Sequence, residues 1–131
     1  MKKILILIIF MFFSCDLTEN RFITIKNNSK DNIFCFISKI DLNNIKSIAE
    51  MNSIAEIKKD EFAFLIPTVR GKWESYLDKC ENNKARVYVV IKDSVDKYGW
   101  NNIYIKNIYA KKYLFSISDL EKINFEINYE N

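Results

Sequence analysis

Apolar and polar positions alternate in short runs along residues 21–131, and polar turn residues bound most of these runs. Their β-branched and aromatic content is typical of strands. Strand-like runs cover residues 21–26, 33–40, 54–57, 62–66, 85–92, 112–115 and 124–129. We therefore expect an α+β, β-rich fold, with an antiparallel sheet or sandwich of about six strands and two or three short helices in the connections.

Two pairs of neighbouring runs are expected to form hairpins. Polar residues 27–32 separate the first two runs, and residues 58–61 separate the third and fourth. In the fourth run, Phe62, Phe64 and Ile66 share one face, because side chains alternate between the two faces of a strand.

Two further runs allow predictions about burial. Residues 85–92 carry apolar side chains on both faces of the predicted strand. We therefore expect this strand in the centre of its sheet. At the end of the chain, alternation over residues 124–129 predicts that Phe125, Ile127 and Tyr129 point inward.

Three short segments have the pattern of a helix. Residues 73–77 are predicted to form a short helix with one apolar side, and residues 95–103 a second helix. Ser116 and Asp119 have the spacing of a capping box, which predicts a third helix of one to two turns. Residues 41–55 have apolar residues at every third position but are rich in Asn and Ser, so we expect a loop with some helical character.

The first 15 residues carry the most specific pattern. Two lysines precede the unbroken apolar run 4–13, and Ser14 and Cys15 follow it. This layout resembles a bacterial lipoprotein signal, in which the cysteine is acylated and the chain is cut before it. The run of ten residues is half of the about 20 that a membrane-spanning helix needs. We predict a removed signal over residues 1–14 and lipidation of Cys15; an ordinary secretory signal is the alternative.

A lipidated Cys15 restricts where the rest of the chain can lie. Residues 15–20 form a short tether before the predicted globular domain 21–131. The five residues after the cysteine span at most about 17 Å. We therefore expect a domain close to the lipid bilayer on an extracytoplasmic membrane face of the cell envelope, with the outer membrane favoured over the inner membrane.

Charge and composition exclude several function classes. Two of the 20 basic residues lie in the signal, so the mature chain keeps 18 basic residues against 17 acidic ones. This near-neutral balance gives no support for nucleic-acid binding. The chain contains no histidine, which excludes histidine-based acid–base catalysis and imidazole metal sites.

Several segments carry a wider resemblance. They are WESYL at 73–77, VVIKDSVDKYGW at 89–100 and KYLFSISDLEKINFEINY at 112–129. With the signal, they make the chain similar to a family of small lipoproteins common in Bacteroidetes. Phe125 stands where members often have Trp, and Glu130 stands where Pro is usual. The resemblance implies an envelope location and a β-rich fold, and it supplies no activity or site residues.

Two cysteines remain after Cys15. Cys35 and Cys80 form an even pair in an oxidising compartment, which makes them a candidate disulfide. The alternative is that Cys35 fills the core and Cys80 is a surface thiol.

Four carboxylates are the only candidates for acid–base chemistry. They form two pairs at the starts of predicted helices: Asp93 with Asp96, and Asp119 with Glu121. Negative charge at a helix start is favoured by the backbone dipole, so we interpret these residues as capping groups, with Asp93 or Ser94 capping residues 95–103. No catalytic residue, cofactor or metal site is predicted.

The sequence thus predicts location better than activity. We expect a membrane-anchored lipoprotein that is not an enzyme and that binds a protein partner or has a structural role in the envelope. A glycan-binding lipoprotein is the alternative, and a hydrolase using Asp93 or Asp119 is less favoured. Core packing is the expected role of Trp73 and Trp100, although exposed aromatic residues could anchor a protein or stack on sugars.

Overall fold

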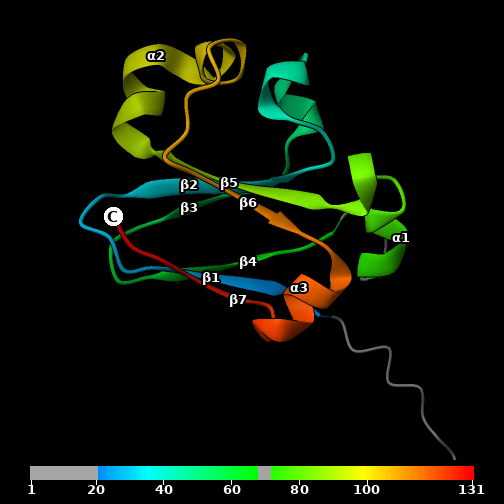
Figure 1. The fold of residues 1–131 in the computed structure, drawn as a ribbon. Helices are drawn as coiled ribbons and strands as arrows, with labels where there is room; N and C mark the ends of the chain where they lie inside the picture. Colours follow the sequence, from blue (N-terminus) through cyan, green and yellow to red (C-terminus); the bar gives the residue numbers. More distant parts are fainter. Residues whose placement is uncertain (1–20, 68–71) are drawn as a thin grey trace, which may run out of the picture.

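The computed structural model describes residues 21–67 and 72–131, so the predicted signal and Cys15 lie outside the described residues. Seven strands form two sheets (Figure 1). The strands are β1 (Ile23–Asn27), β2 (Ile33–Ser38), β3 (Asn52–Ile57), β4 (Phe62–Leu65), β5 (Ala85–Ile91), β6 (Lys111–Phe115) and β7 (Glu126–Tyr129). The helices are α1 (Trp73–Leu77), α2 (Lys92–Ile105) and α3 (Ile117–Lys122), with short 3₁₀ turns η1 (Leu42–Asn44), η2 (Ile48–Glu50) and η3 (Glu81–Asn83). The predicted β-rich α+β class is confirmed.

The two sheets have different sizes and pairings. One has three strands in the order β4-β1-β7, with β1 antiparallel to β4 and parallel to β7. The other has four antiparallel strands in the order β3-β2-β5-β6. Strand β5 lies between β2 and β6, as its two apolar faces predict. In Figure 1 the sheets lie one above the other, and α2 covers the side of the four-stranded sheet that faces away from the three-stranded sheet.

Both hairpin predictions are wrong. Strand β1 pairs with β4 and β7, whereas β2 and β3 pair with each other in the opposite sheet. The chain therefore crosses between the sheets in each predicted turn. The buried side chain of Asn27 holds these crossings together, because its Nδ2 donates to the carbonyls of Asp31 (2.7 Å) and Ile57 (3.1 Å). Its Oδ1 accepts from the hydroxyl of Ser29 (2.6 Å).

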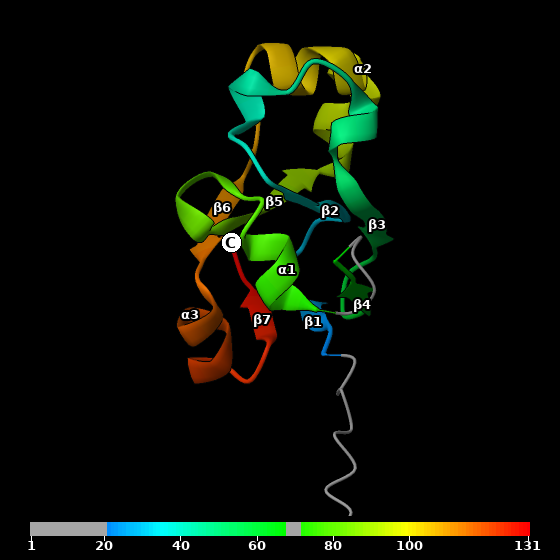
Figure 2. The ribbon, with the colours of Figure 1, turned by 90° about the vertical axis from the view of Figure 1, so that its right-hand side faces the viewer.

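The main core lies between the sheets. It contains the inward residues of both sheets together with side chains from α1 and α3, which lie at one end of the sandwich (Figure 2). Phe125, Ile127 and Tyr129 are buried there, as their alternation predicts. Trp73 is fully buried, and its indole Nε1 donates to the carbonyl of Arg21 (2.8 Å).

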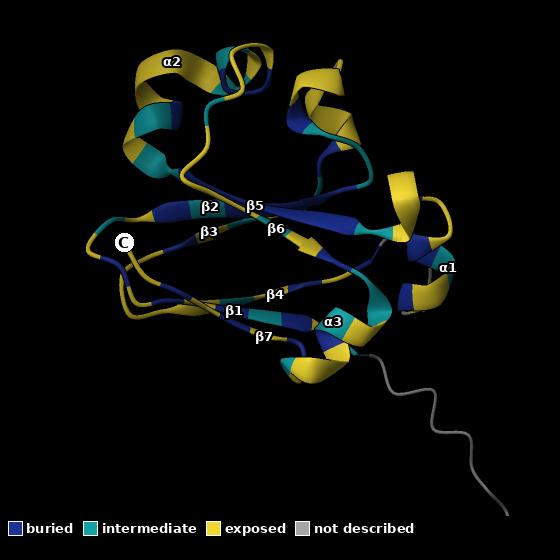
Figure 3. Cartoon of the chain, viewed as in Figure 1, coloured by how far each residue is buried: buried dark blue, intermediate teal, exposed yellow. Residues whose placement is uncertain are grey.

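A second core lies on the other side of the four-stranded sheet. It buries Phe36, Tyr88 and Val90 beneath side chains from α2, η1 and the following loop. Phe36 stacks on Tyr88 with ring centroids 5.3 Å apart, and Trp100 on α2 meets Phe36 edge-on at 6.1 Å. In Figure 3, β2 and β5 are largely buried, whereas the outer side of α2 is exposed. This layer explains why β5 is apolar on both faces.

The helix predictions have mixed outcomes. Helix α1 occupies the predicted residues, and α3 begins with the predicted capping box between Ser116 and Asp119. The capping prediction for α2 is wrong, since its N-cap is Ile91 and no side-chain cap is formed. The segment 41–55 contains η1 and η2 and then enters β3 at Asn52. Within the described part of the chain, no helix is long and apolar enough to cross a membrane.

Candidate functional site

The outer face of the three-stranded sheet is built by the outward residues of its strands. Strand alternation places Ile23 and Ile25 in the core, so Thr24 and Lys26 point outward. On β4 the inward residues are Ala63 and Leu65, and the outward residues are Phe62 and Phe64. On β7 the outward residues are Glu126 and Asn128. No described segment covers this face, which points away from α2 in Figure 1.

Four apolar side chains on this face form an exposed patch, which we call the aromatic face: Phe22, Phe62, Phe64 and Ile66. The rings of Phe22 and Phe64 lie 5.9 Å apart, and those of Phe62 and Phe64 lie 5.5 Å apart. Phe62 is 60% exposed and Phe64 is 52% exposed. Phe62, Phe64 and Ile66 share a face as predicted, but this face lies outside the core.

The strand register gives this surface an apolar side and a polar side. Phe64 lies opposite Thr24, and Phe62 lies opposite Lys26. On the far side of β1, Glu126 and Asn128 of β7 continue these two rows. A hollow of about 290 Å³ lies among these side chains. The side chains on this surface therefore change from phenylalanines at the β4 edge to polar groups at the β7 edge.

Such a surface is unusual for a solvated sheet. Antiparallel strands with one face in water normally carry polar side chains on that face. Edge strands are normally protected by charge, proline or short length, because an apolar edge invites association. Strand β4 is short, but Phe62 and Phe64 stand on it as two neighbouring exposed rings. Contiguous exposed apolar side chains of this kind make this face a candidate interaction surface.

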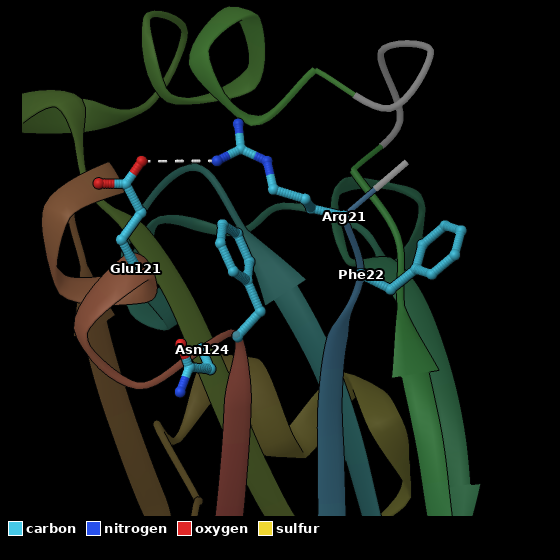
Figure 4. Close-up of a pocket in the computed structure, with 5 residues that line it drawn as sticks. Arg21, Phe22, Glu121 and Asn124 are labelled. Carbon is cyan, nitrogen blue, oxygen red and sulfur yellow. Dashed lines mark ion pairs between the residues drawn. The ribbon is translucent and has the colours of Figure 1, made fainter. Parts of the chain in front are cut away.

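A second hollow, of about 420 Å³, lies beside the first described residues (Figure 4). Arg21 pairs there with Glu74 (2.5 Å) and Glu121 (3.5 Å), and its guanidinium lies 5.0 Å from the ring centre of Phe125. The pKa of Glu74 lies below its usual value because of its own backbone N–H and the nearby Arg21. Phe22 points away from the Arg21–Glu121 pair in Figure 4. The carboxylates of Glu74 and Glu121 balance the charge of Arg21. These ion pairs hold the first described residues against the rest of the domain.

The four candidate carboxylates do not form a shared site. Asp119 accepts hydrogen bonds from the backbone (2.9 Å) and hydroxyl (2.8 Å) of Ser116, and these bonds lower its pKa. Asp96 pairs with Lys92, and Glu121 pairs with Arg21. Asp93 is exposed in the first turn of α2. Among the described residues, no group of three or more histidine, cysteine or acidic side chains could hold a metal ion.

The candidate disulfide is not formed in the structure, where Cys35 and Cys80 are free and buried. Cys35 lies in the main core on β2, and the thiol of Cys80 donates to the carbonyl of Tyr76 (3.3 Å). Burial raises the pKa of both thiols, that of Cys80 to about 11. Both side chains therefore act as small core residues with low thiolate character at neutral pH.

One buried charge is not predicted from the sequence. Arg86 on β5 is 4% exposed, and its guanidinium contacts Asp41 (2.9 Å) and Glu81 (2.7 Å). Lys112 also pairs with Asp41 (3.0 Å). Partial burial raises the pKa of Asp41, but hydrogen bonds from Lys112 and Arg86 outweigh it, so the pKa lies below its usual value. An arginine inside the apolar run ARVYVVI was the available signal.

No protein family, curated protein or solved structure matches this chain. The resemblance to small bacterial lipoproteins therefore stays a prediction. Every buried side-chain nitrogen or oxygen in the described residues has a hydrogen-bond partner. The aromatic face is thus the strongest candidate for a functional surface.

Proposed function

We propose that the protein is a lipid-anchored module on an extracytoplasmic face of the bacterial envelope, with a structural or binding role and no catalysis. Cys15 carries the lipid after removal of residues 1–14. The observation that carries the proposal is the aromatic face, an interaction surface that begins seven residues after Cys15. Anchor and contact surface are therefore close together in the chain.

The chemistry of the aromatic face favours an apolar occupant. Phenylalanine and isoleucine have no hydrogen-bonding group, whereas sugar recognition needs polar partners around a stacking ring. Among the described residues that line its hollow, the polar side chains come from β1 and β7. A glycan is therefore a weaker candidate than a protein or the membrane.

Fatty-acid labelling and membrane fractionation test the anchor. The full chain should incorporate fatty acid and sediment with membranes, and Cys15→Ser should incorporate none and change its gel mobility. A Cys15→Ser protein that keeps the same mobility and membrane association would refute the lipid anchor.

Thiol labelling in isolated envelopes tests the contact surface. Lys26→Cys places a thiol on the outer side of β1, and Lys106→Cys is the matched control after α2, since both lysines are exposed. The native Cys35 and Cys80 are buried. A polar maleimide should label Lys26→Cys several-fold more slowly than Lys106→Cys, and the background change Phe62→Ser with Phe64→Ser should remove the difference. Equal labelling rates in the original background would refute the proposed surface.

A further inference from the structure

We infer that the aromatic face docks on the lipid bilayer, with Phe22, Phe62, Phe64 and Ile66 lying at the boundary between headgroups and acyl chains. This inference rests on the proposed lipid anchor at Cys15. It names the occupant of the face and fixes how the domain is oriented on the membrane.

Chain length supplies the first argument. Six residues separate Cys15 from Phe22, so their Cα atoms lie at most about 25 Å apart. A domain of this size has a radius of gyration of about 13 Å, so its width exceeds the reach of this segment. An anchored domain is therefore held within about 25 Å of the bilayer, close enough for its surface to contact the lipid. Phe22 belongs to the aromatic face and, among the described residues, is the exposed apolar residue nearest in sequence to the anchor.

The arrangement of the fold supplies the second argument. Phe22 lies directly before β1, at the end of the sheet where the chain enters this strand. From that end, the aromatic face extends along β1 and β4. Figures 1 and 2 show β1 and β4 on the side of the molecule opposite α2. The anchor consequently brings this side to the membrane, and α2 with its exposed outer surface faces away from it.

Side-chain chemistry supplies the third argument. Surfaces that lie in the membrane interface present Phe, Leu or Trp to the acyl boundary and polar groups to the headgroups. Across the sheet, the neighbouring side chains of Phe62, Lys26 and Asn128 change in the same way, from an apolar ring to polar groups. The stem of Lys26 can lie along Phe62 while its ammonium reaches the phosphates. Because an open sheet edge cannot enter the hydrocarbon, only the side chains insert and the backbone of β4 stays at headgroup level.

The lipid chains and the aromatic face have separate roles in this arrangement. Two or more acyl chains suffice for stable attachment, and attachment raises the local concentration of bilayer around the face. Weak insertion of a few side chains is then enough to orient the domain. Without the phenylalanines, the domain should lose its fixed orientation on the membrane, while the protein stays attached through its lipid.

Fluorescence quenching in pure lipid vesicles tests the inference. The mature lipidated protein carries a polarity-sensitive dye at Lys26→Cys or Lys106→Cys and is reconstituted in phosphatidylcholine vesicles, with or without bromine on the acyl chains. The dye at residue 26 should shift to shorter wavelength and be quenched by bromine, and the dye at residue 106 should show neither effect. Phe62→Ser with Phe64→Ser should remove both effects while the protein still floats with the vesicles.

The outcomes separate this inference from the proposed function. Equal emission and quenching at the two positions, or quenching that survives the double substitution, would overturn bilayer docking. Protection of residue 26 in native envelopes without protection in pure vesicles would also overturn it and would assign the face to a protein. Failure of the protein to float with the vesicles would instead refute the lipid anchor of the proposed function.

Discussion

The outer faces of both sheets carry phenylalanines, but the two faces differ in what covers them. The four-stranded sheet presents Phe36, Tyr88 and Val90, which α2 and η1 bury in a second core. The three-stranded sheet presents Phe62 and Phe64, which stay exposed within the described part of the chain. Apolar residues on a sheet face therefore indicate that a covering layer is needed. They do not show whether the chain itself supplies that layer.

Truncation of one phenylalanine on each face gives the largest expected difference. Phe36→Ala should lower the free energy of unfolding by about 3–5 kcal/mol, because it empties a fully packed site. Phe64→Ala should change it by less than about 0.5 kcal/mol, because its ring is half exposed. Urea unfolding followed by the fluorescence of Trp73 and Trp100 measures both. Similar losses for the two variants would show that the faces do not differ.

Arg86 on β5 links the sheet to the covering layer through Asp41, which precedes η1, and it also contacts Glu81 of η3. Arg86→Met keeps the volume but removes the contacts to Asp41 and Glu81. We expect a loss of about 1.5–3 kcal/mol, the range for hydrogen bonds to charged groups. The carboxylates left behind are partly exposed, which keeps the loss below that of a fully buried pair. An unchanged midpoint in urea would show that Arg86 does not secure this layer.

The covering layer also contains a backbone position that favours glycine. Gly99 interrupts α2 with φ 73° and ψ 155°, and an added Cβ would meet no atom within 4 Å. Gly99→Ala should therefore cost about 1–2 kcal/mol through backbone strain alone. Thermal unfolding should show a lower midpoint for Gly99→Ala, with Ala110→Gly as an exposed comparison in the following loop. Equal midpoints for Gly99→Ala and the original chain would contradict the strain argument.

The smallest effect is expected in acid. The folded pKa of Asp41 is lowered, so the unfolded state binds more protons in the window between the folded and unfolded pKa values. The stabilisation is present above the unfolded value of about 3.9 and is lost as the pH falls through the folded value. Asp41→Asn should therefore lose stability less steeply than the original chain below about pH 4. Parallel slopes in urea titrations at several pH values would show that Asp41 makes no such contribution.

The strands could be predicted from the sequence, but their partners could not. Alternation located β5 and β7 and their inward residues because burial follows local periodicity. The turn after β1 gave no sign that β2 belongs to the other sheet. The buried side chain of Asn27 accompanies that choice, because it donates to the carbonyl of Asp31 and to that of Ile57, which lies 30 residues further along the chain. Long-range hydrogen bonds of this kind leave no periodic pattern.

The candidate surface was predicted in part. The sequence showed that Phe62, Phe64 and Ile66 share a face. It did not show that Leu65, which is smaller than phenylalanine, points into the core instead. The inward face of β4 is set by its pairing with β1, and hydrophobicity alone favours the wrong side. Phe22 joins the surface only because β1 and β4 are antiparallel neighbours.

The central position of β1 in its sheet has a mechanical consequence. The chain enters the described domain directly through this strand, which is hydrogen-bonded to β4 on one side and to β7 on the other. A pull on the amino terminus directed along the strand therefore loads both ladders in shear. Their hydrogen bonds share the force and cannot open one at a time from an end. Drag on the domain would be resisted by the sheet whose outer surface we place against the lipid.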